Sequence, residues 1–331
     1  MIGYYVHHVG SGHLHRARAV AAVSRRPVTG LSTLPRPEDW PGEWVELSRD
    51  DQSPTPRDVT AGGRLHWVPR QDPGLRDRMA TIAGWVARAR PDVLVSDVSV
   101  EVALLARLHG VPVASFVLPG DRTDPAHLLG YEVSDALVAC WPAGLDGMTP
   151  GLPDELRSRI TCVGGLSRIP VSDPEPSQAT PRRVVVLLGR GGGHPSPQAI
   201  DSARAQTPDW HWTVLGPGHQ WADDVRDVLA GADVVVTQAG ENALAEVAAC
   251  RKPAIVVPAD RPHDEQRTTA GVLTEGPWPV VVEPTFPLSG WAERLVAAHC
   301  LDGARWSGWC DGKAARRIVD VLDGVATTHA P

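Results

Sequence analysis

Short apolar runs alternate with longer stretches of helical periodicity along this chain. An apolar run at residues 2–9 is followed by helical spacing of apolar residues over 14–23. The same alternation predicts a strand at 93–97, a helix at 100–108 and a strand at 111–116. Strands that alternate with helices of this length are typical of βαβ units, in which helices cover a parallel sheet.

The pattern breaks once, in a segment near the middle of the chain. Residues 166–182 contain four prolines among Ser, Asp and Glu residues, and such a segment continues neither a helix nor a central strand. We therefore predict one Rossmann-like domain over residues 1–165, a linker over 166–182 and a second Rossmann-like domain over 183–312. A helix within 313–331 is expected to cross back to the first domain.

Further apolar runs complete both predicted sheets. They lie at residues 136–140 and 160–163 before the linker, and at 183–188, 211–215, 234–238 and 254–258 after it, with a helix expected at 242–250. The predicted fold class is α/β, with two doubly wound Rossmann-like domains facing one another across a cleft.

Composition and charge narrow the class of protein. The chain has 331 residues, of which 42% are apolar and 21% charged, as in ordinary globular proteins. Its net charge of −7 argues against a protein that binds nucleic acid through long-range attraction to the phosphates, so no nucleic-acid partner is expected.

Cysteine spacing and the N-terminal residues bear on the compartment. The five cysteines form no CxxC pair, which suits neither a zinc ribbon nor a disulfide framework and favours a reducing cytoplasm. The first residues lack the basic and long apolar regions of a signal peptide. No apolar run approaches the roughly 20 residues needed to span a bilayer. Peripheral contact with a membrane surface is left open.

The first loop with candidate chemistry joins the first predicted strand to its helix. It reads Gly10-Ser11-Gly12-His13, and glycines allow a ligand to approach a helix N-terminus closely. The third glycine of a dinucleotide fingerprint is missing, because Arg16 stands there. We interpret His13 either as a cap of the turn or as a catalytic residue at the ligand-binding edge of the sheet.

Several histidines near this loop raise the question of a metal site. His7 and His8 are expected on opposite faces of a strand, and no carboxylate or cysteine joins them, His13 and His15 in sequence. No metal site is therefore predicted.

A second glycine-rich loop follows the strand at 183–188. It comprises Gly189, Arg190, Gly191, Gly192 and Gly193. Backbone N–H groups in such a loop can bind a diphosphate, and the arginine adds charge. The Walker pattern is absent, and a glycine turn without a ligand is the alternative.

The third element is a strand that runs through a small turn into a helix. Gln238, Ala239 and Gly240 lead into a helix whose first N–H groups, near Glu241 and Asn242, would face a phosphate. Alternatively, Glu241 is only an acid in the first turn that complements the helix dipole.

Two further polar groups extend this element. Glu246 lies one turn into the helix, within reach of the two hydroxyls of a ribose on that phosphate. Further along, Asp264, Glu265 and Gln266 follow a strand end and suit sugar hydroxyls, although a solvated loop is the default for such a run.

Residues 232–270 resemble the nucleotide-sugar-binding region of inverting GT-B glycosyltransferases. The likeness is nearest to the family 28 type, which includes the peptidoglycan N-acetylglucosaminyltransferase. It is carried by the segment ADVVVTQAGENALAE at 232–246, by Lys-Pro-Ala at 252–254 and by Asp-Glu-Gln at 264–266. The segment at 91–97 also resembles a stretch of plant and antibiotic transferases whose aspartate orients the catalytic histidine.

The resemblance implies that the domain at 1–165 binds the acceptor and that the domain at 183–312 binds the nucleotide-sugar donor, and it implies roles for individual residues. Glu246 would bind the donor ribose, Trp221 would border the uracil base, and the two glycine loops would bind the donor phosphates. The implied catalytic residues are His13, as general base, and Asp97; a cap of the helix at 100–108 is the alternative for Asp97. The donor-binding residues implied are Gly12, Gly189, Arg190, Gly191, Gly192, Gly193, Trp221, Gln238, Ala239, Gly240, Glu241, Asn242, Glu246, Asp264, Glu265 and Gln266.

The expected function is that of an inverting, metal-independent hexosyltransferase that needs no cofactor. Its donor would be a UDP-sugar carrying an N-acetylhexosamine or a hexose, and its acceptor a small or lipid-linked molecule. Residues 121–129 match no acceptor site of the family, so the acceptor stays open. A nucleotide-sugar hydrolase or 2-epimerase of the same fold, and a non-catalytic accessory subunit of a transferase, are the alternatives.

Overall fold

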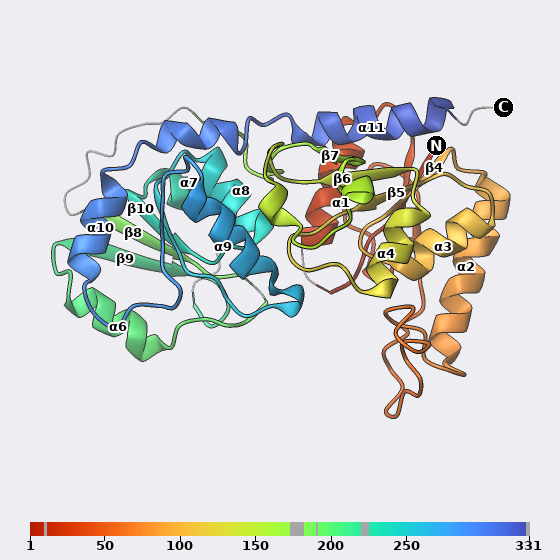
Figure 1. The fold of residues 1–331 in the computed structure, drawn as a ribbon, viewed down its shortest axis with the longest axis horizontal. Helices are drawn as coiled ribbons and strands as arrows, with labels where there is room; N and C mark the ends of the chain where they lie inside the picture. Colours follow the sequence, from red (N-terminus) through yellow and green to blue (C-terminus); the bar gives the residue numbers. More distant parts are fainter. Residues whose placement is uncertain (10–11, 173–181, 190, 220–224, 329–331) are drawn as a thin grey trace.

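The computed structural model describes residues 1–9, 12–172, 182–189, 191–219 and 225–328, which form two α/β halves side by side (Figure 1). The first half contains a seven-stranded sheet and the second a five-stranded sheet, and every strand pair in both is parallel. The predicted α/β class with two parallel sheets is therefore confirmed.

The first sheet has the order β3-β2-β1-β4-β5-β6-β7. Its strands are β1 (Ile2–Tyr5), β2 (Val28–Ser32), β3 (Trp44–Glu46), β4 (Val93–Ser96), β5 (Val113–Phe116), β6 (Ala136–Ala139) and β7 (Ile160–Cys162). The helices of this half are α1 (Gly12–Val23), α2 (Pro73–Ala89), α3 (Val100–Leu108), α4 (Pro125–Glu132) and α5 (Asp154–Arg157), with a short 3₁₀ turn η1 (Asp146–Met148). The central strands are apolar along their length because helices cover both faces of the sheet.

The second sheet has the order β12-β11-β10-β8-β9. Its strands are β8 (Arg182–Leu187), β9 (Trp210–Leu215), β10 (Val234–Thr237), β11 (Ala254–Val256) and β12 (Val280–Val282). The helices here are α6 (Pro197–Ala205), α7 (Val225–Ala230), α8 (Glu241–Ala249), α9 (Glu265–Glu275), α10 (Trp291–His299) and α11 (Ala314–Thr328), with 3₁₀ turns η2 (Pro262–Asp264) and η3 (Gly303–Gly308).

The two halves share buried apolar surface. One hydrophobic cluster runs from Leu137 and Met148 of the first half to Val235 and Val247 of the second. The helix α11 follows the second half in sequence but packs against α1 and β6 of the first (Figure 1). Its Ile318, fully buried, lies in the same cluster as β1 and β4.

Polar contacts also join the halves beside the strand ends. The backbone N–H of Asp121 donates to the carbonyl of His263 (2.9 Å), and Arg122 Nη2 donates to Glu265 Oε2 (3.2 Å). Gly120 has a φ of +101°, and a Cβ there would collide with the same carbonyl of His263, so glycine permits this close approach.

Local sequence explains where several helices begin. Side-chain oxygens of Asp72, Ser99, Asp124 and Ser196 accept backbone N–H groups at the starts of α2, α3, α4 and α6. Such caps satisfy the first amides of a helix, which have no partner within it. At α8 the corresponding residue is Gly240, which has no side chain to offer.

The sequence predictions differ from the structure in two respects. The strand predicted at residues 2–9 ends at Tyr5, because the chain turns away after β1. The short strands β2, β3 and β12 were missed, since Gly30 interrupts the apolar pattern of β2 and the other two have only three residues each. The helices α2, α4, α5, α6, α7, α9 and α10 were not predicted either. The helix predicted at 100–108 is confirmed.

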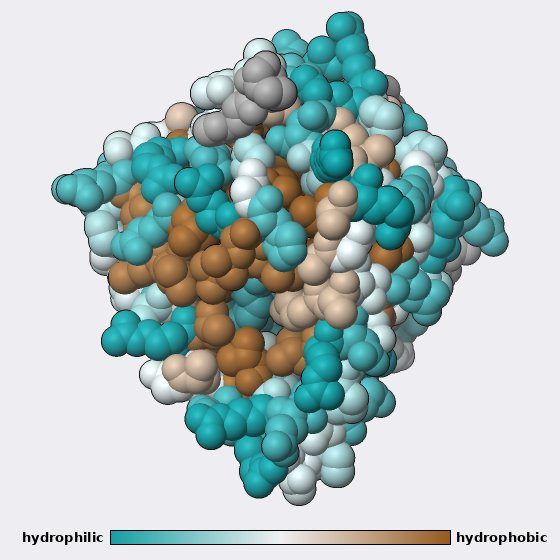
Figure 2. Space-filling model, turned by 90° about the vertical axis from the view of Figure 1, so that its right-hand side faces the viewer, coloured by the Kyte–Doolittle hydropathy of each residue, from teal (hydrophilic) through white to brown (hydrophobic). Residues whose placement is uncertain are grey.

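The surface at the end formed by the first half exposes apolar side chains across its middle, bordered by polar ones (Figure 2). Leu108 of α3 has 75% of its surface exposed, the second-largest fraction among the exposed large apolar residues of the described chain. Among the described helices, none combines the length and the apolar character needed to cross a bilayer.

Candidate active site

A cleft of about 450 Å³ lies between the two halves at the carboxyl ends of their strands. Ligands of open α/β sheets bind at this edge. The predicted residues that line it are Gly12, His13, Gly189, Gly191, Gln238, Ala239, Gly240, Glu241, Asn242, Glu265 and Gln266. The lining residues that sequence reasoning missed include Arg16, Leu118, Pro119, Arg261 and Thr269.

An imidazole–carboxylate pair stands on the first wall of the cleft. His13 lies in the first turn of α1 and Asp97 directly follows β4, and these elements meet because β1 and β4 are paired neighbours. His13 Nδ1 is 2.9 Å from Asp97 Oδ1. The carboxylate is fully buried, and the hydroxyl of Tyr4 lies 3.3 Å from its other oxygen. The alternative role as a helix cap falls to Ser99 instead, whose hydroxyl accepts the N–H of Val102.

Arg16 connects this pair to the second wall. Its Nη1 donates to Asp97 Oδ1 and its Nη2 to Glu241 Oε1, both at 2.5 Å. The arginine side chain is buried, with 4% of its surface exposed. The guanidinium also lies over the ring of Phe116, 4.5 Å from the centroid. Burial alone would raise the pKa of Asp97, but the charges of Arg16 and His13 outweigh it and hold the pKa below its ordinary value. The carboxylate therefore stays ionised at neutral pH.

The second wall presents backbone groups. Helix α8 starts after Gly240 with no side chain bonded to its first amides. Gly12 packs against the side-chain amide of Asn242, and a Cβ on this glycine would collide with that amide. The N-terminus of α8 thus opens toward the first wall, and its free N–H groups and dipole favour an anion.

Side chains on the second wall hold the glycine loop in place. Gln238 Nε2 donates to the carbonyls of Gly192 (3.0 Å) and Gly193 (2.9 Å). The guanidinium of Arg261 also donates to carbonyls of this loop, and it adds positive charge to the cleft. Gln266 Oε1 accepts the backbone N–H of Ala259 (2.9 Å).

The structure does not bring every predicted residue into the cleft. Glu246 is 5% exposed and faces a separate small pocket, where Arg168 Nε donates to Oε1 (2.5 Å) and Nη2 lies 3.4 Å from Oε2. Burial raises the pKa of Glu246, and Arg168 opposes this. Asp264 is exposed beside Arg267, and Gly193 lines a neighbouring cavity of about 290 Å³. Predictions for Gly10, Ser11, Arg190 and Trp221 lie outside the described residues.

The N-terminal histidines are arranged differently from the prediction. His7 and His8 were expected on opposite strand faces, but they follow the end of β1 and their rings stack with centroids 5.0 Å apart. The ring of His7 also lies 5.6 Å from that of His13. Burial, with the neighbouring imidazoles, lowers the pKa of His7 to about 4, so this histidine is neutral at pH 7.

A cavity of about 290 Å³ on the first half adjoins these histidines. Its walls come from Tyr5, His7, His8, Val9, Asp50, Asp51, Trp67, Arg78, Met79, Ser99, Glu101 and Val102. Arg78 is buried and ion-paired with Asp50 at 2.7 Å, which fixes one side of the cavity. Sequence reasoning missed it because its residues come from five separate segments and form no local motif.

Comparison with known proteins finds a family model that matches part of the second half. Residues 183–275 match the model of the glycosyltransferase family 28 C-terminal domain. This stretch runs from β8 to the last turn of α9 and includes the whole second wall of the cleft. No curated protein sequence matches the chain.

Solved structures of similar shape cover nearly the whole chain. The glycotransferase of kitacinnamycin is 17% identical over 98% of both chains, with a TM-score of 0.66. MurG of Acinetobacter baumannii is 14% identical over 98% of this chain and 99% of its own, with a TM-score of 0.63. UGT2 of Phytolacca americana, whose structure is a complex with UDP-2-fluoro-glucose and pterostilbene, is 16% identical over 98% of this chain and 94% of its own, with a TM-score of 0.60. The GT-B fold and the resemblance to the family 28 type are therefore confirmed.

Proposed function

We propose that this chain, which has the GT-B fold and a second half matching the family 28 glycosyltransferase C-terminal domain, transfers a sugar from a UDP-sugar to a small acceptor with inversion. One observation carries the proposal. A buried His13–Asp97 pair and the uncapped N-terminus of α8 lie on opposite walls of one cleft. A proton acceptor thus faces an anion-binding helix, as displacement of a nucleoside diphosphate requires.

The histidine acts as the general base. Asp97 accepts a hydrogen bond from the Nδ1–H group of His13, which leaves Nε2 free to take the proton of the acceptor hydroxyl. The acceptor oxygen forms a bond to the anomeric carbon from the side opposite the diphosphate. The bond from that carbon to the diphosphate oxygen breaks, and UDP leaves with the electron pair. Inversion follows from this single displacement.

Positive and dipolar groups of the second wall stabilise the leaving diphosphate. The N–H groups at the start of α8 and the guanidinium of Arg261 surround the position where charge develops. The preceding glycine loop, with Arg190, is proposed to add to them. We expect these groups to make a metal unnecessary for transfer.

Two further features support the assignment of the substrates. UDP as the donor nucleotide is supported by the family 28 match and by the UDP-sugar derivative in the similar UGT2 structure. The cavity of about 290 Å³ beside His7 is the proposed acceptor pocket. Its size suits a small molecule.

Calorimetric titration with UDP, dTDP, GDP and CMP in the presence of EDTA tests the donor site. We expect preferential binding of UDP, followed by transfer when UDP-sugars are screened against small hydroxylated acceptors. Binding of none of the nucleotides would contradict the proposal and favour an accessory role. Release of free sugar without any acceptor would indicate a hydrolase, and interconversion of two UDP-sugars a 2-epimerase.

A further inference from the structure

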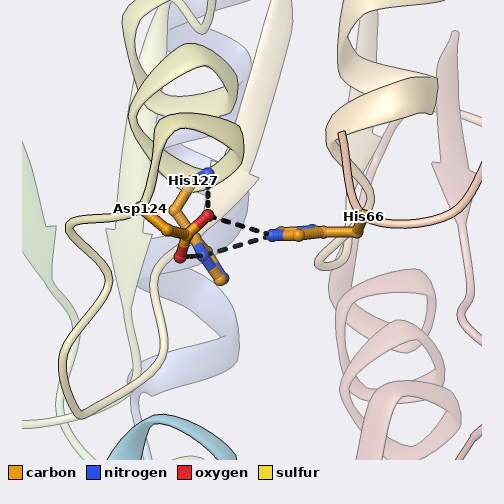
Figure 3. Close-up of side chains that lie close together, drawn as sticks. All are labelled: His66, Asp124 and His127. Carbon is orange, nitrogen blue, oxygen red and sulfur yellow. Dashed lines mark hydrogen bonds and ion pairs between the residues drawn. The ribbon is translucent and has the colours of Figure 1, made fainter. Parts of the chain in front are cut away.

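Three side chains with metal-ligating atoms converge in the first half, away from the His13–Asp97 pair. His66 comes from the loop between β3 and α2, while Asp124 and His127 belong to the start of α4 (Figure 3). Their ligand atoms all lie within 4.8 Å of one another. Within the described part of the chain, no other such group of three forms.

The spacing of these atoms resembles the edges of a tetrahedral metal site. His66 Nε2 is 3.2 Å from His127 Nδ1 and 3.5 Å from Asp124 Oδ1. Zinc bound tetrahedrally at about 2.0–2.1 Å from nitrogen separates its ligand atoms by about 3.3 Å. His127 Nδ1 lies 2.5 Å from the other carboxylate oxygen, Asp124 Oδ2, and this distance would lengthen if both atoms bound one ion.

The backbone around the cluster holds its side chains in place. Asp124 Oδ1 caps α4 by accepting the N–H groups of Ala126 and His127, both at 3.1 Å, which leaves Oδ2 for a further partner. Glu101 Oε1 accepts the backbone N–H groups of His66 (2.7 Å) and Trp67 (3.0 Å) and so ties this loop to α3. Ligands fixed by such contacts lose little freedom on binding an ion.

The charges and protons of the cluster also suit a cation. With neutral imidazoles and an ionised Asp124 the cluster carries one negative charge, and a proton on His127 Nδ1 joins this atom to Asp124 Oδ2. A divalent ion replaces that proton. Arg122 Nη1 lies 3.3 Å from His127 Nε2, so ligation through Nδ1 moves the ring proton to Nε2 and turns Arg122 away.

We propose that His66, Asp124 and His127 bind one divalent transition-metal ion, with Zn²⁺ the best fit and water at the fourth position. Nitrogen and carboxylate ligands favour zinc and its neighbours over Mg²⁺ or Ca²⁺, which prefer oxygen alone. The side chains of His66 and Asp124 are 33% and 37% exposed, so the ion has a path from solvent. The site goes beyond the proposed transfer, since it shares no residue with the proposed base or donor site.

Calorimetric titration of the full-length protein with ZnCl₂, after treatment with EDTA and desalting, tests the site. We expect one equivalent to bind to the wild type and to the control His211→Ala, which removes an exposed histidine of β9. His66→Ala should weaken Zn²⁺ binding by at least roughly 10–100-fold. Loss of a residue that only hydrogen-bonds a metal ligand already lowers metal affinity by that much, and loss of the ligand itself should cost no less. Asp124→Asn should weaken it too, while its amide oxygen still caps α4.

Two results would overturn the site. One is the absence of saturable Zn²⁺ binding to the wild type. The other is equal affinity in the wild type and in His66→Ala, since the ion would then lie elsewhere. Substitution with Co²⁺ gives a second readout, because a tetrahedral site produces intense visible absorption that His66→Ala must lose. Thermal denaturation of each variant shows that lost binding does not reflect lost folding.

Discussion

The two walls of the cleft are built from different parts of the polypeptide. The first wall acts through side chains, with His13, Asp97 and Arg16 in direct contact. The second acts through backbone N–H groups at the start of α8 and through a glycine loop held by Gln238. Proton transfer needs a titratable side chain, whereas a diphosphate is bound well by amides that never titrate. Under the proposed function, acid–base chemistry therefore falls to one half and charge stabilisation to the other.

Of the changes that test this division between the walls, replacing His13 with Ala should have the largest effect. Removal of a general base should lower the transfer rate roughly 10²–10⁴-fold. UDP affinity should change little, because the phosphates bind the other wall. Steady-state kinetics and UDP titration measure the two effects, with His109→Ala, at an exposed position after α3, as the control. A collapse of UDP binding would instead make His13 a donor ligand.

Replacing Arg16 with Met tests the connection between the walls. The variant leaves Asp97 buried without its guanidinium, and breaking a buried ion pair costs about 3 kcal/mol of unfolding free energy. Urea denaturation measures this loss. The matched variant Glu241→Gln removes only the partner on the second wall and should cost about 1 kcal/mol. Equal losses in the two variants would show that Arg16 serves the second wall and not Asp97.

The same division explains what could be predicted from the sequence. The second wall is local, because strand β10, its turn and α8 follow one another in the chain and leave a contiguous motif. The contact between Arg16 and Glu241 joins residues that are 225 positions apart, so no local sequence pattern predicts it. The ion pair of Glu246 with Arg168 was missed for the same reason. His13 was a candidate from its own loop, but its pairing with Asp97 was identified only through the resemblance, since 84 residues separate them.

Glu246 offers a sharper test of the second wall, where a role in ribose binding stays a prediction. Glu246→Gln should lower UDP affinity about tenfold, or about 1.4 kcal/mol, if its carboxylate binds the ribose hydroxyls. Arg168→Met, which breaks the same ion pair from the other side, should leave UDP affinity nearly unchanged. Titration of both variants with UDP makes the comparison. Equal loss of stability in both, with UDP affinity unaltered in both, would assign Glu246 a structural role.

The smallest effect we expect is a pH dependence of stability that arises from the first wall. The pKa of His7 is about 4 in the folded protein and about 6.5 when unfolded, so the unfolded chain binds a proton first as pH falls. Stability is therefore full above pH 6.5 and declines between pH 6.5 and 4.

Urea denaturation at pH 7.5 and 5.0 measures this decline. Since His7 is only partly buried, we expect His7→Gln to reduce the difference between the two pH values by about 1 kcal/mol. The exposed control His109→Gln should leave it unchanged. An unaltered difference in His7→Gln would show that other groups carry the dependence. A reduced one would locate this part of the pH response beside His13, on the wall that holds titratable side chains and not on the wall that binds through amides.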